Sequence, residues 1–548
     1  MNDSPIVSTM MPVHLSLNHF LERAGLLFAN NEVISRRPDK SYVHHTYADI
    51  YTRTRQLAQA LLQLGLKKGD RVATLCWNHH VHLECYFGIP AAGGVMHTLN
   101  LRLSADEIAW IANDAKDRFL IVDDVLLPLL DQFKDQCHFE KIIVVPFTGQ
   151  THGGPELDYE TLLSQTDTSD FQYVKHHEDD PVSMCYTSGT TGKPKGVVYS
   201  HRSTVLHTLV GCLGDFWSLK STDVVFPVTP MFHANSWGIP YGAMMMGAKL
   251  VFPGPHLHPE DLLDCMQYAP PTLALGVPTI WMGLIQTYEA ALQTQPNRWR
   301  LPAGMRSLVG GAAVPQALIK AFDKHGIWIM QGWGMTETSP LCTVSYTKAE
   351  FANASEDEKY RRAAMAGVPV PLVDLRIRDD NGLDAAWDGQ QVGEIQVSGP
   401  FITGSYHQVP VQADKFTDDG WLRTGDVASV DAAGFVRITD RTKDLIKSGG
   451  EWISSIELEN AAAAHPQVAM AAVIGVKHPK WDERPLLLIV RKQEDFSNKQ
   501  EILDFLSERV AKWWVPDDIV FVTGLPVGGT GKVQKAELRI QYGSIFSE

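Results

Sequence analysis

A loop rich in glycine, hydroxyl and lysine side chains is the part of the sequence whose composition points most directly to chemistry. It reads TSGTTGKPKG at residues 187–196 and follows an apolar segment at residues 182–186. Its glycines let backbone N–H groups turn toward an anion, and its hydroxyls and two lysines add further donors. It differs from a Walker loop, because proline follows the Gly-Lys pair where a Walker loop has Ser or Thr. The loop therefore predicts a polyphosphate site, although a flexible surface loop can have the same composition.

Alternating helix and strand patterns precede this loop and must position it. Apolar residues recur at helical spacing from Tyr47 to Leu64, and a short apolar strand follows at residues 71–76. A capping box of Ser104 and Glu107 opens another predicted helix. The same pattern predicts a helix from His82 and strands at residues 95–99 and 119–122. This alternation predicts a layered α/β fold with largely parallel sheets.

The pattern of apolar, glycine and charged residues changes twice toward the C-terminus. Short alternating runs with Gly and Pro around residues 392–405 predict a β-rich segment. After Asp440 a charged stretch is followed by patterns that predict a small α+β unit of about 100 residues, within the usual range for a domain. Its predicted elements are a helix at residues 455–464, strands at residues 469–476 and 486–490, and a helix that runs through Leu506.

These patterns divide the chain into two expected domains. With 548 residues the chain exceeds what one hydrophobic core usually serves. We expect a large N-terminal domain at residues 1–439, built of layered α/β subdomains plus the β-rich part. A hinge at residues 440–445 would join it to a small mobile C-terminal α+β domain at residues 446–548.

Composition and charge exclude several classes of function. Apolar residues make up 44% of the chain and charged residues 20%, as in globular proteins. A net charge of -15 repels polyanions and argues against nucleic acid as a partner. The seven scattered cysteines fit neither disulfides nor zinc fingers, and no apolar run is long enough to span a membrane. We therefore expect a cytoplasmic protein without integral membrane association.

Six further motifs follow the phosphate loop along the sequence. Together with TSGTTGKPKG they resemble, in the same order, the motifs of the adenylate-forming superfamily of acyl-CoA synthetases, luciferases and peptide-synthetase adenylation domains. The additional motifs are GGAAVP at residues 310–315, QGWGMTET at 331–338, TGD at 424–426, DRTKD at 440–444, KSGG at 447–450 and GGTGK at 528–532. The resemblance covers residues 186–532 and is strongest to medium- and long-chain fatty acyl-CoA synthetases.

The resemblance implies that the chain uses ATP, Mg²⁺ and coenzyme A to convert a carboxylic acid into a thioester through an acyl-adenylate. It also implies a possible homodimer. A ligase for a short, methylthio-substituted or aromatic acid on the same scaffold stays open as an alternative. A luciferase-like oxidase is less favoured, because nothing in the sequence marks oxygen chemistry.

Roles in the first half-reaction follow from the same resemblance. Lys532 would neutralise charge on the transferring α-phosphate, and Thr336 would touch that phosphate. Glu337 would hold Mg²⁺ together with Thr187. Trp333 offers a face for adenine, and Asp426 can accept hydrogen bonds from the ribose hydroxyls. The implied ATP- and AMP-binding residues are Thr187, Ser188, Gly189, Thr190, Thr191, Gly192, Lys195, Gly311, Gln331, Gly332, Trp333, Gly334, Thr336, Asp426, Arg441 and Lys443.

The second half-reaction needs a different set of residues. The small domain is expected to rotate near Lys443, so that a new face replaces the Lys532 loop and coenzyme A can enter. His233 matches a position beside the acyl carboxylate, where we expect it to orient rather than to act as a base. The implied coenzyme A residues are His233, Lys447, Ser448, Gly449, Gly450 and Trp452.

The acyl tail is expected to lie in an apolar pocket whose length the sequence does not determine. Trp237 matches the tryptophan that gates the acyl tunnel in relatives, and Val277 would form another wall. Small residues at Gly238, Gly276 and Gly310 would leave room for the tail. Several histidine clusters, including His79-His80-Val-His82, lack an evident set of further ligands, so we interpret them as surface or structural residues.

Overall fold

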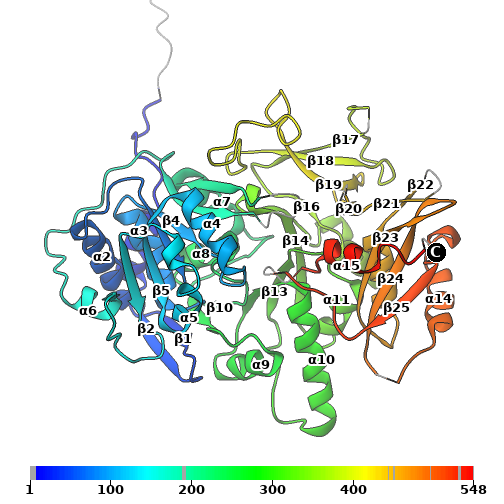
Figure 1. The fold of residues 1–548 in the computed structure, drawn as a ribbon, viewed down its shortest axis with the longest axis horizontal. Coiled ribbons are helices and arrows are strands. Elements are labelled where there is room, and N and C mark those ends of the chain that lie inside the picture. The colour runs from blue at the N-terminus through cyan, green and yellow to red at the C-terminus, as the bar shows by residue number, and fades with distance from the viewer. Residues whose placement is uncertain are drawn as a thin grey trace, which may run out of the picture.

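The structure is a computed structural model. It describes residues 8–187, 193–379, 381–441, 443–448, 451–493, 495–528 and 532–546. The strands of these residues form four sheets, flanked by helices (Figure 1). Within the described ranges, every helix is too short or too polar to cross a bilayer. The mixed α/β class that the sequence predicts is confirmed.

The first sheet is largely parallel and is covered on both faces. Its strands, in spatial order, are β7 (Leu157–Asp158), β6 (Lys141–Val145), β5 (Asp117–Asp123), β3 (Arg71–Leu75), β4 (Val95–Thr98), β8 (Pro181–Tyr186) and β9 (Gly196–Ser200). Alternate residues of β5 point to opposite faces: Phe119 packs with Leu57 of α2 (Tyr47–Gln63), whereas Leu120 packs with Ile108 of α4 (Ala105–Ala115). Burial on both faces explains why these strands read as continuous apolar runs.

Local signals predicted these elements closely. The capping box at Ser104 is present, since the Ser104 hydroxyl accepts from the backbone N–H of Glu107 and the Glu107 carboxylate accepts from Ser104. Helix α3 (His80–Ala91) begins two residues before the predicted start, because the imidazole of His79 caps it by accepting from the N–H of Val81.

The second sheet has nine strands and a parallel centre. In spatial order they are β16 (Val368–Pro369), β15 (Leu341–Val344), β14 (Trp328–Gly334), β13 (Arg306–Gly310), β12 (Leu273–Gly276), β10 (Val224–Pro227), β11 (Lys249–Phe252), β1 (Glu32–Arg36) and β2 (Tyr42–Thr46). The outer strands β2, β15 and β16 are antiparallel to their neighbours. Buried residues of α9 (Pro259–Tyr268), α10 (Pro278–Thr294) and α11 (Gln316–Asp323) share one core with strands of this sheet.

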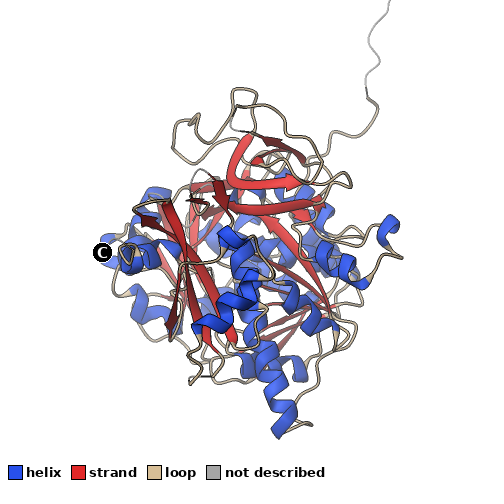
Figure 2. Cartoon of the chain, turned by 90° about the vertical axis from the view of Figure 1, so that its right-hand side faces the viewer, coloured by secondary structure: helices blue, strands red, loops and turns tan. Residues whose placement is uncertain are grey.

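Further helices, of which α8 is buried along nearly its whole length, complete the two large layers. They are α1 (Asn18–Leu27), α5 (Leu127–Leu130), α6 (Tyr159–Ser164), α7 (His201–Gly211), α8 (Ile239–Met246) and α12 (Glu356–Ala363). Seen from the side, the helices flank the strands on both sides of the molecule (Figure 2).

A third sheet forms where the sequence predicts a β-rich part. Its antiparallel strands are β17 (Asp374–Arg378), β18 (Gly393–Ser398), β19 (Leu422–Val430) and β20 (Val436–Arg441). Asp426 of β19 is paired with Arg441 of β20. This register brings two predicted nucleotide-binding residues together at the end of the last strand before the predicted hinge.

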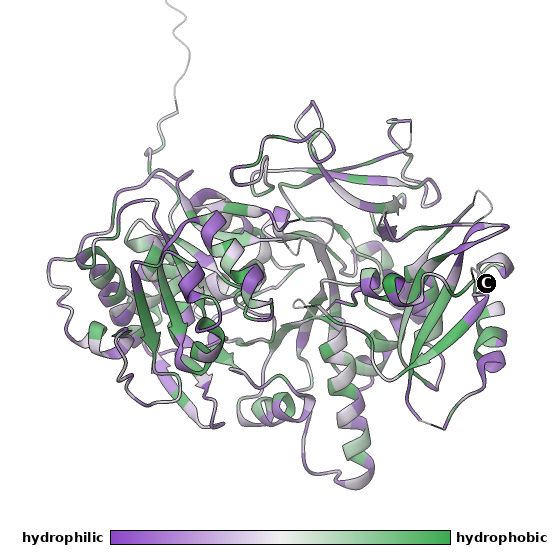
Figure 3. Cartoon of the chain, in the orientation of Figure 1, coloured by the Kyte–Doolittle hydropathy of each residue, from purple (hydrophilic) through white to green (hydrophobic). Residues whose placement is uncertain are grey.

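The C-terminal part has its own sheet and helices, shown in orange and red in Figure 1. Its strands are β22 (Glu451–Ile453), β21 (Ile446–Ser448), β24 (Asp482–Arg491), β23 (Val468–His478) and β25 (Asp518–Val522), and its helices are α13 (Ser455–Ala463), α14 (Lys499–Ser507) and α15 (Lys535–Tyr542). Separate apolar clusters lie on the two faces of this sheet, which is hydrophobic in Figure 3. The helices and strands predicted in this region are confirmed to within a few residues.

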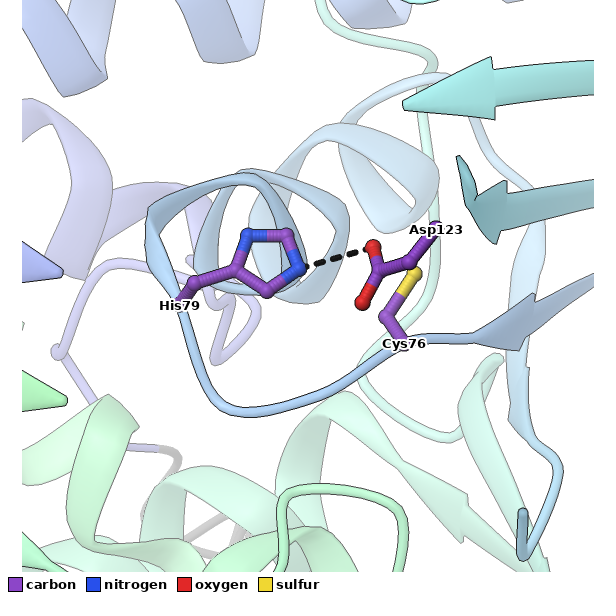
Figure 4. A group of neighbouring side chains, drawn as sticks. All are labelled: Cys76, His79 and Asp123. Atoms are coloured by element: carbon purple, nitrogen blue, oxygen red, sulfur yellow. Dashed lines mark hydrogen bonds and ion pairs between the residues drawn. The ribbon is translucent and has the colours of Figure 1, made fainter. Parts of the chain in front are cut away.

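A buried polar group joins β3, β5 and the start of α3 (Figure 4). The ligand atoms of Cys76, His79 and Asp123 lie within 4.8 Å of one another and all three residues are buried. The ring nitrogen Nε2 of His79 lies 2.8 Å from one Asp123 oxygen, and the N–H of Trp77 donates to the other at 2.8 Å. Of the two interpretations that the sequence allowed, surface or structural, the structural one fits His79, because protein hydrogen bonds use both oxygens of Asp123 and both ring nitrogens of His79.

Candidate active site

A cavity of about 360 Å³ lies where the phosphate loop, the ends of the nine-stranded sheet, the third sheet and the Lys532 loop meet. The predicted site residues that line it are Thr187, Lys195, His233, Trp237, Gly310, Gly311, Gly332, Trp333, Gly334, Thr336, Glu337, Arg441 and Lys532. Residues far apart in the sequence therefore share one cavity.

The topology of the sheet explains why these residues meet. Strands β13 and β14 are parallel neighbours, and the register pairs Gly310 with Gly332. Both strands thus deliver their carboxyl ends, and the loops that follow, to the same edge. This edge is where open α/β sheets place ligands.

Asp426, the predicted ribose ligand, does not line the cavity itself but contacts two residues that do, and it is only 5% exposed. The indole Nε1–H of Trp333 donates to one carboxylate oxygen at 2.9 Å. The Nε of Arg441 lies 3.1 Å from the other oxygen. These contacts fix the carboxylate between an aromatic side chain and a cation, so that a ribose hydroxyl would share its oxygens with them.

Glu337 is a buried carboxylate at the predicted metal position. It is 6% exposed and lies in the short turn that follows β14. The hydroxyl of Tyr406 donates to its Oε1 at 2.7 Å. An oxygen ligand that faces a phosphate site suits Mg²⁺. The remaining carboxylate lone pairs are available for such an ion.

The ends of the phosphate loop are joined by hydrogen bonds. The N–H of Thr187 donates to the carbonyl of Lys195 at 2.9 Å, and the N–H of Lys195 donates to the Thr187 hydroxyl at 3.1 Å. The Lys195 ammonium donates to Gln412 at 2.6 Å and lies over the ring of Tyr406. The predicted phosphate ligands Ser188, Gly189, Thr190, Thr191 and Gly192 lie outside the described residues.

Lys532 and His233 face the same cavity from opposite parts of the chain. Burial, together with nearby Arg441, lowers the pKa of Lys532 to about 8, although Asp426 and Glu337 oppose the shift. Burial and the Lys532 charge lower the pKa of His233 to about 4. At neutral pH the site therefore holds a mostly protonated lysine and a neutral imidazole.

Trp237 ends a backbone segment with left-handed φ angles. The φ angles of Ala234, Asn235, Ser236 and Trp237 are 43°, 51°, 50° and 58°, a run of left-handed residues without glycine. Side chains hold this turn: Nδ2 of Asn235 donates to the Ser183 hydroxyl at 2.8 Å, and the Ser236 hydroxyl donates to the carbonyl of Thr229 at 2.9 Å. Strained backbone of this kind persists only where its surroundings fix it.

The glycines predicted to make room for an acyl tail leave no room for a side chain of their own, although Gly310 itself lines the cavity. A Cβ on Gly276 would lie 2.8 Å from the indole nitrogen of Trp281, and a Cβ on Gly238 would lie 3.0 Å from the ring of His207. A Cβ on Gly310 would meet the carbonyl of Gly332 at 2.6 Å. These three positions need glycine for close packing, and the apolar lining of the cavity comes from Trp217, Trp237, Leu308 and Leu341.

Several predicted residues lie beside the cavity or away from it. The amide oxygen of Gln331 accepts from the N–H of Val314 at 3.3 Å, so Gln331 supports the turn after β13. Val277 lies next to Gly311, where a Cβ would be 3.4 Å from it. Burial lowers the pKa of Lys443, which lies near Arg441 and Asp426.

The predicted coenzyme A face lies on the β21–β22 hairpin. Lys447 and Trp452 are paired across it, and the Lys447 ammonium lies 5.8 Å from the centre of the half-exposed Trp452 ring. Ser448 accepts from Arg484 at 3.2 Å. None of these three described residues lines the cavity. Gly449 and Gly450 lie outside the described residues.

Some lining residues were missed by sequence reasoning. They are Lys193, Trp217, Ala234, Leu308, Met335, Pro340, Leu341, Tyr406, Gln412, Asp414, Lys415 and Thr424. Lys193, Met335 and Thr424 fall within the motifs given above, so their place at the site could have been predicted from those motifs. No local signal marks Tyr406 or Gln412, which reach the site from the loop after β18.

Comparisons with known proteins agree with this geometry. A model of the AMP-binding enzyme family matches residues 22–407, and a model of the AMP-binding enzyme C-terminal domain matches residues 457–532. A long-chain-fatty-acid–CoA ligase of Thermus thermophilus is 44% identical, over 98% of each chain. A 3-methylmercaptopropionyl-CoA ligase of Ruegeria lacuscaerulensis is 42% identical, over 98% of this chain and 99% of that protein.

A solved structure shares the fold as well. The anthranilate CoA ligase AuaEII in complex with anthranoyl-AMP has a TM-score of 0.86 and 25% identity, over 98% of this chain and 99% of that chain. The family models, the relatives and the shared fold together show that the chain belongs to the AMP-binding enzyme family, the adenylate-forming superfamily, as an AMP-forming acyl-CoA synthetase.

Proposed function

We propose that this enzyme joins a medium- or long-chain fatty acid to coenzyme A through an acyl-adenylate. The observation that carries this proposal is the convergence of Lys532, Trp333 and Glu337 on one cavity. The name of the Thermus thermophilus relative supports a fatty acid as the substrate. The apolar side chains of Trp237 and Leu341 in the cavity wall support it too.

In the first half-reaction a carboxylate oxygen attacks the α-phosphorus of ATP. A new P–O bond forms, the bond to the bridging oxygen of the β-phosphate breaks, and pyrophosphate leaves. Lys532 supplies positive charge where negative charge develops, in a partly buried site where that charge is worth more than in water. Trp333 and Asp426 hold the adenosine, so that the reacting atoms stay aligned.

The donor set fits a magnesium ion. Glu337 and the hydroxyl of Thr187 would hold it, since both line the cavity and offer hard oxygen ligands. When bound, the ion neutralises phosphate charge. Tyr406 then orients the Glu337 carboxylate through its hydrogen bond.

In the second half-reaction the thiol sulfur of coenzyme A attacks the acyl carbon. A C–S bond forms, the C–O bond to AMP breaks, and the thiol proton is released. We propose that residues 446–548 rotate about a hinge at residues 440–445, so that the Lys447–Trp452 hairpin replaces the Lys532 loop. The outward position of the hairpin, away from the cavity, supports such an exchange. His233, neutral at pH 7, orients the acyl group.

A ligase for a short thioether or aromatic acid is the second candidate. Two observations favour it: the Ruegeria relative is nearly as similar, and the space beside Gly276 and Gly238 is filled by Trp281 and His207. One methylene changes binding in a hydrophobic pocket by about 1–3 kcal/mol, so neighbouring side chains decide the preferred chain length.

A substrate series tests both candidates. Coenzyme A consumption is measured with purified enzyme and ATP across linear acids of increasing length, 3-methylthiopropionate and benzoate. The fatty-acid proposal expects kcat/KM to rise through medium or long chains. A maximum at 3-methylthiopropionate or benzoate would establish the second candidate, and absence of any thioester would contradict both.

Two further properties are proposed. The seven cysteines are all unpaired thiols, which supports a reducing compartment such as the cytoplasm. The resemblance to related enzymes supports a homodimer, which sedimentation analysis would test.

A further inference from the structure

Helix α15 follows directly on the loop that carries Lys532. It begins at Lys535, three residues after Lys532. The position of the Lys532 ammonium therefore depends on how the first turn of α15 is held. The only apolar anchor of the helix that is fully buried is Leu538. Its first turn is fixed instead by polar contacts.

Lys535 makes these contacts inside the protein. Its Nζ lies 2.7 Å from Oε1 of Glu459 and donates to the hydroxyl of Ser455 at 2.6 Å. The side chains of Lys535 and Glu459 are only 14% and 21% exposed. Oε1 of Glu459 also accepts from the N–H of Val473 in β23 at 2.8 Å. Lys535 thus ties α15 to the body of the C-terminal part.

The same hydroxyl connects Lys535 to the end of β20, where the proposed hinge begins. The Ser455 hydroxyl and N–H both donate to Oδ2 of Asp440, at 2.6 Å and 2.7 Å. Asp440 is 1% exposed and lies in β20, next to Arg441, which contacts Asp426. Ser455 begins α13 of the C-terminal part, so this contact crosses from the third sheet to the part that carries Lys532.

A second pair acts on the same helix. Nη2 of Arg539 lies 2.6 Å from Oδ1 of Asp444, within the proposed hinge. Arg539 therefore contacts the proposed hinge directly, whereas Lys535 reaches Asp440 through Ser455.

A buried ion pair is weak evidence for stability by itself, because desolvation offsets most of the attraction. In some proteins such pairs instead select one arrangement among several. The geometry here fits that role, since the contacts connect the two parts that the proposed mechanism moves. A surface pair such as Lys499 with Asp518 lies wholly within the C-terminal part and has no such connection.

We propose that Lys535, with Ser455 and Asp440, is a positioning residue for Lys532: the Lys535–Ser455–Asp440 bridge holds the C-terminal part in the orientation that delivers Lys532 to the nucleotide. The inference rests on the proposed function, because it assigns the bridge to one of the two half-reactions. Formation of the adenylate needs the bridge. Conversion of the adenylate to the thioester, which needs a rotated C-terminal part, does not.

The test compares the two half-reactions in two variants. Lys535→Met removes the cation, and Ser455→Ala removes only the hydroxyl that joins Lys535 to Asp440. We expect pyrophosphate release from ATP and acid to fall about tenfold to a hundredfold in Lys535→Met, as small misplacements of catalytic groups do. A smaller loss in the same half-reaction is expected in Ser455→Ala. Thioester formation from supplied acyl-AMP should stay near the wild-type rate in both.

Lys499→Met is the matched control, because it removes an ion pair of the same part without touching the bridge. Rates are normalised to the amount of folded protein, which thermal unfolding measures. If Lys535→Met does not fold, the result for Ser455→Ala alone tests the inference. Equal loss of both half-reactions, or an unchanged adenylation rate in Ser455→Ala, overturns the inference. Wild-type enzyme that forms no thioester would instead contradict the proposed function, so the two failures are distinguishable.

Discussion

Removal of the Lys532 side chain is the sharpest perturbation of the proposed mechanism. The Lys532→Ala variant takes away a cation that lines the cavity, while the residues proposed to hold adenosine and the metal ion stay in place. The pKa of Lys532 is lowered to about 8, so at neutral pH most molecules still carry the charge that the variant removes.

The expected loss follows from the site. Removal of one preorganised donor that stabilises developing charge costs about 2.7–4 kcal/mol, or about 10²–10³ in kcat. Arg441 lies close enough to lower the pKa of Lys532. It can compensate only partly, because its guanidinium is engaged with Asp426. We therefore expect a loss of about 10²–10³ in adenylate formation.

The assay separates the two steps. Pyrophosphate release from ATP and acid reports adenylate formation, and coenzyme A consumption with supplied acyl-AMP reports thioester formation. The first should fall in Lys532→Ala and the second should stay largely intact, because in the proposed mechanism the Lys532 loop leaves the site before the thiol attacks. Lys512→Ala, an exposed lysine of the same C-terminal part, is the control. An equal loss of rate in both half-reactions would refute the proposal that the Lys532 loop acts only in adenylate formation.

Three further predictions concern pH, the metal site and stability. The charged form of Lys532 is lost as pH rises through its lowered pKa of about 8, so adenylate formation should decline above that pH. Lys532→Arg should remove the decline, and a pH profile of pyrophosphate release checks both expectations. Tyr406→Phe removes a hydrogen bond to the Glu337 carboxylate worth about 1.5–3 kcal/mol. It should raise the Mg²⁺ concentration needed for half-maximal rate about tenfold or more, whereas an unchanged Mg²⁺ titration speaks against Glu337 as a ligand. Asp123→Asn weakens the hydrogen bond to His79 and should lower the free energy of unfolding by about 1–3 kcal/mol without changing KM for ATP. Denaturant unfolding measures this loss, and a stability equal to wild type would contradict a structural role for the pair.

Local signals in the sequence were sufficient to predict most of the framework. The start of α4 could be predicted from Ser104 and Glu107, because both partners of the capping box lie within one turn. The strands of the first sheet could be predicted from apolar runs, since burial on both faces leaves no alternation. The order of the strands and the meeting of four segments at one cavity could not be read from such local patterns.

The details of the site depended on contacts that are distant in sequence. Tyr406 donates to Glu337 across 69 residues, and no motif marks the tyrosine. Gly276 suggested open space, yet the indole of Trp281 in α10 fills it. His79 gave no sign of Asp123, which comes from a neighbouring strand. Motifs predicted which residue types the chemistry needs, whereas tertiary packing determined which of them have room for a ligand.

The left-handed turn at Trp237 has a consequence for how the wall of the cavity keeps its shape. Each non-glycine residue in this conformation costs about 1–2 kcal/mol, so four in succession store several kcal/mol in the backbone. The hydrogen bonds of Asn235 and Ser236 offset that cost only while they are intact. Loss of either side chain would leave Trp237 on a backbone that favours another conformation, so the shape of this part of the cavity wall depends on two polar residues that do not carry the indole themselves.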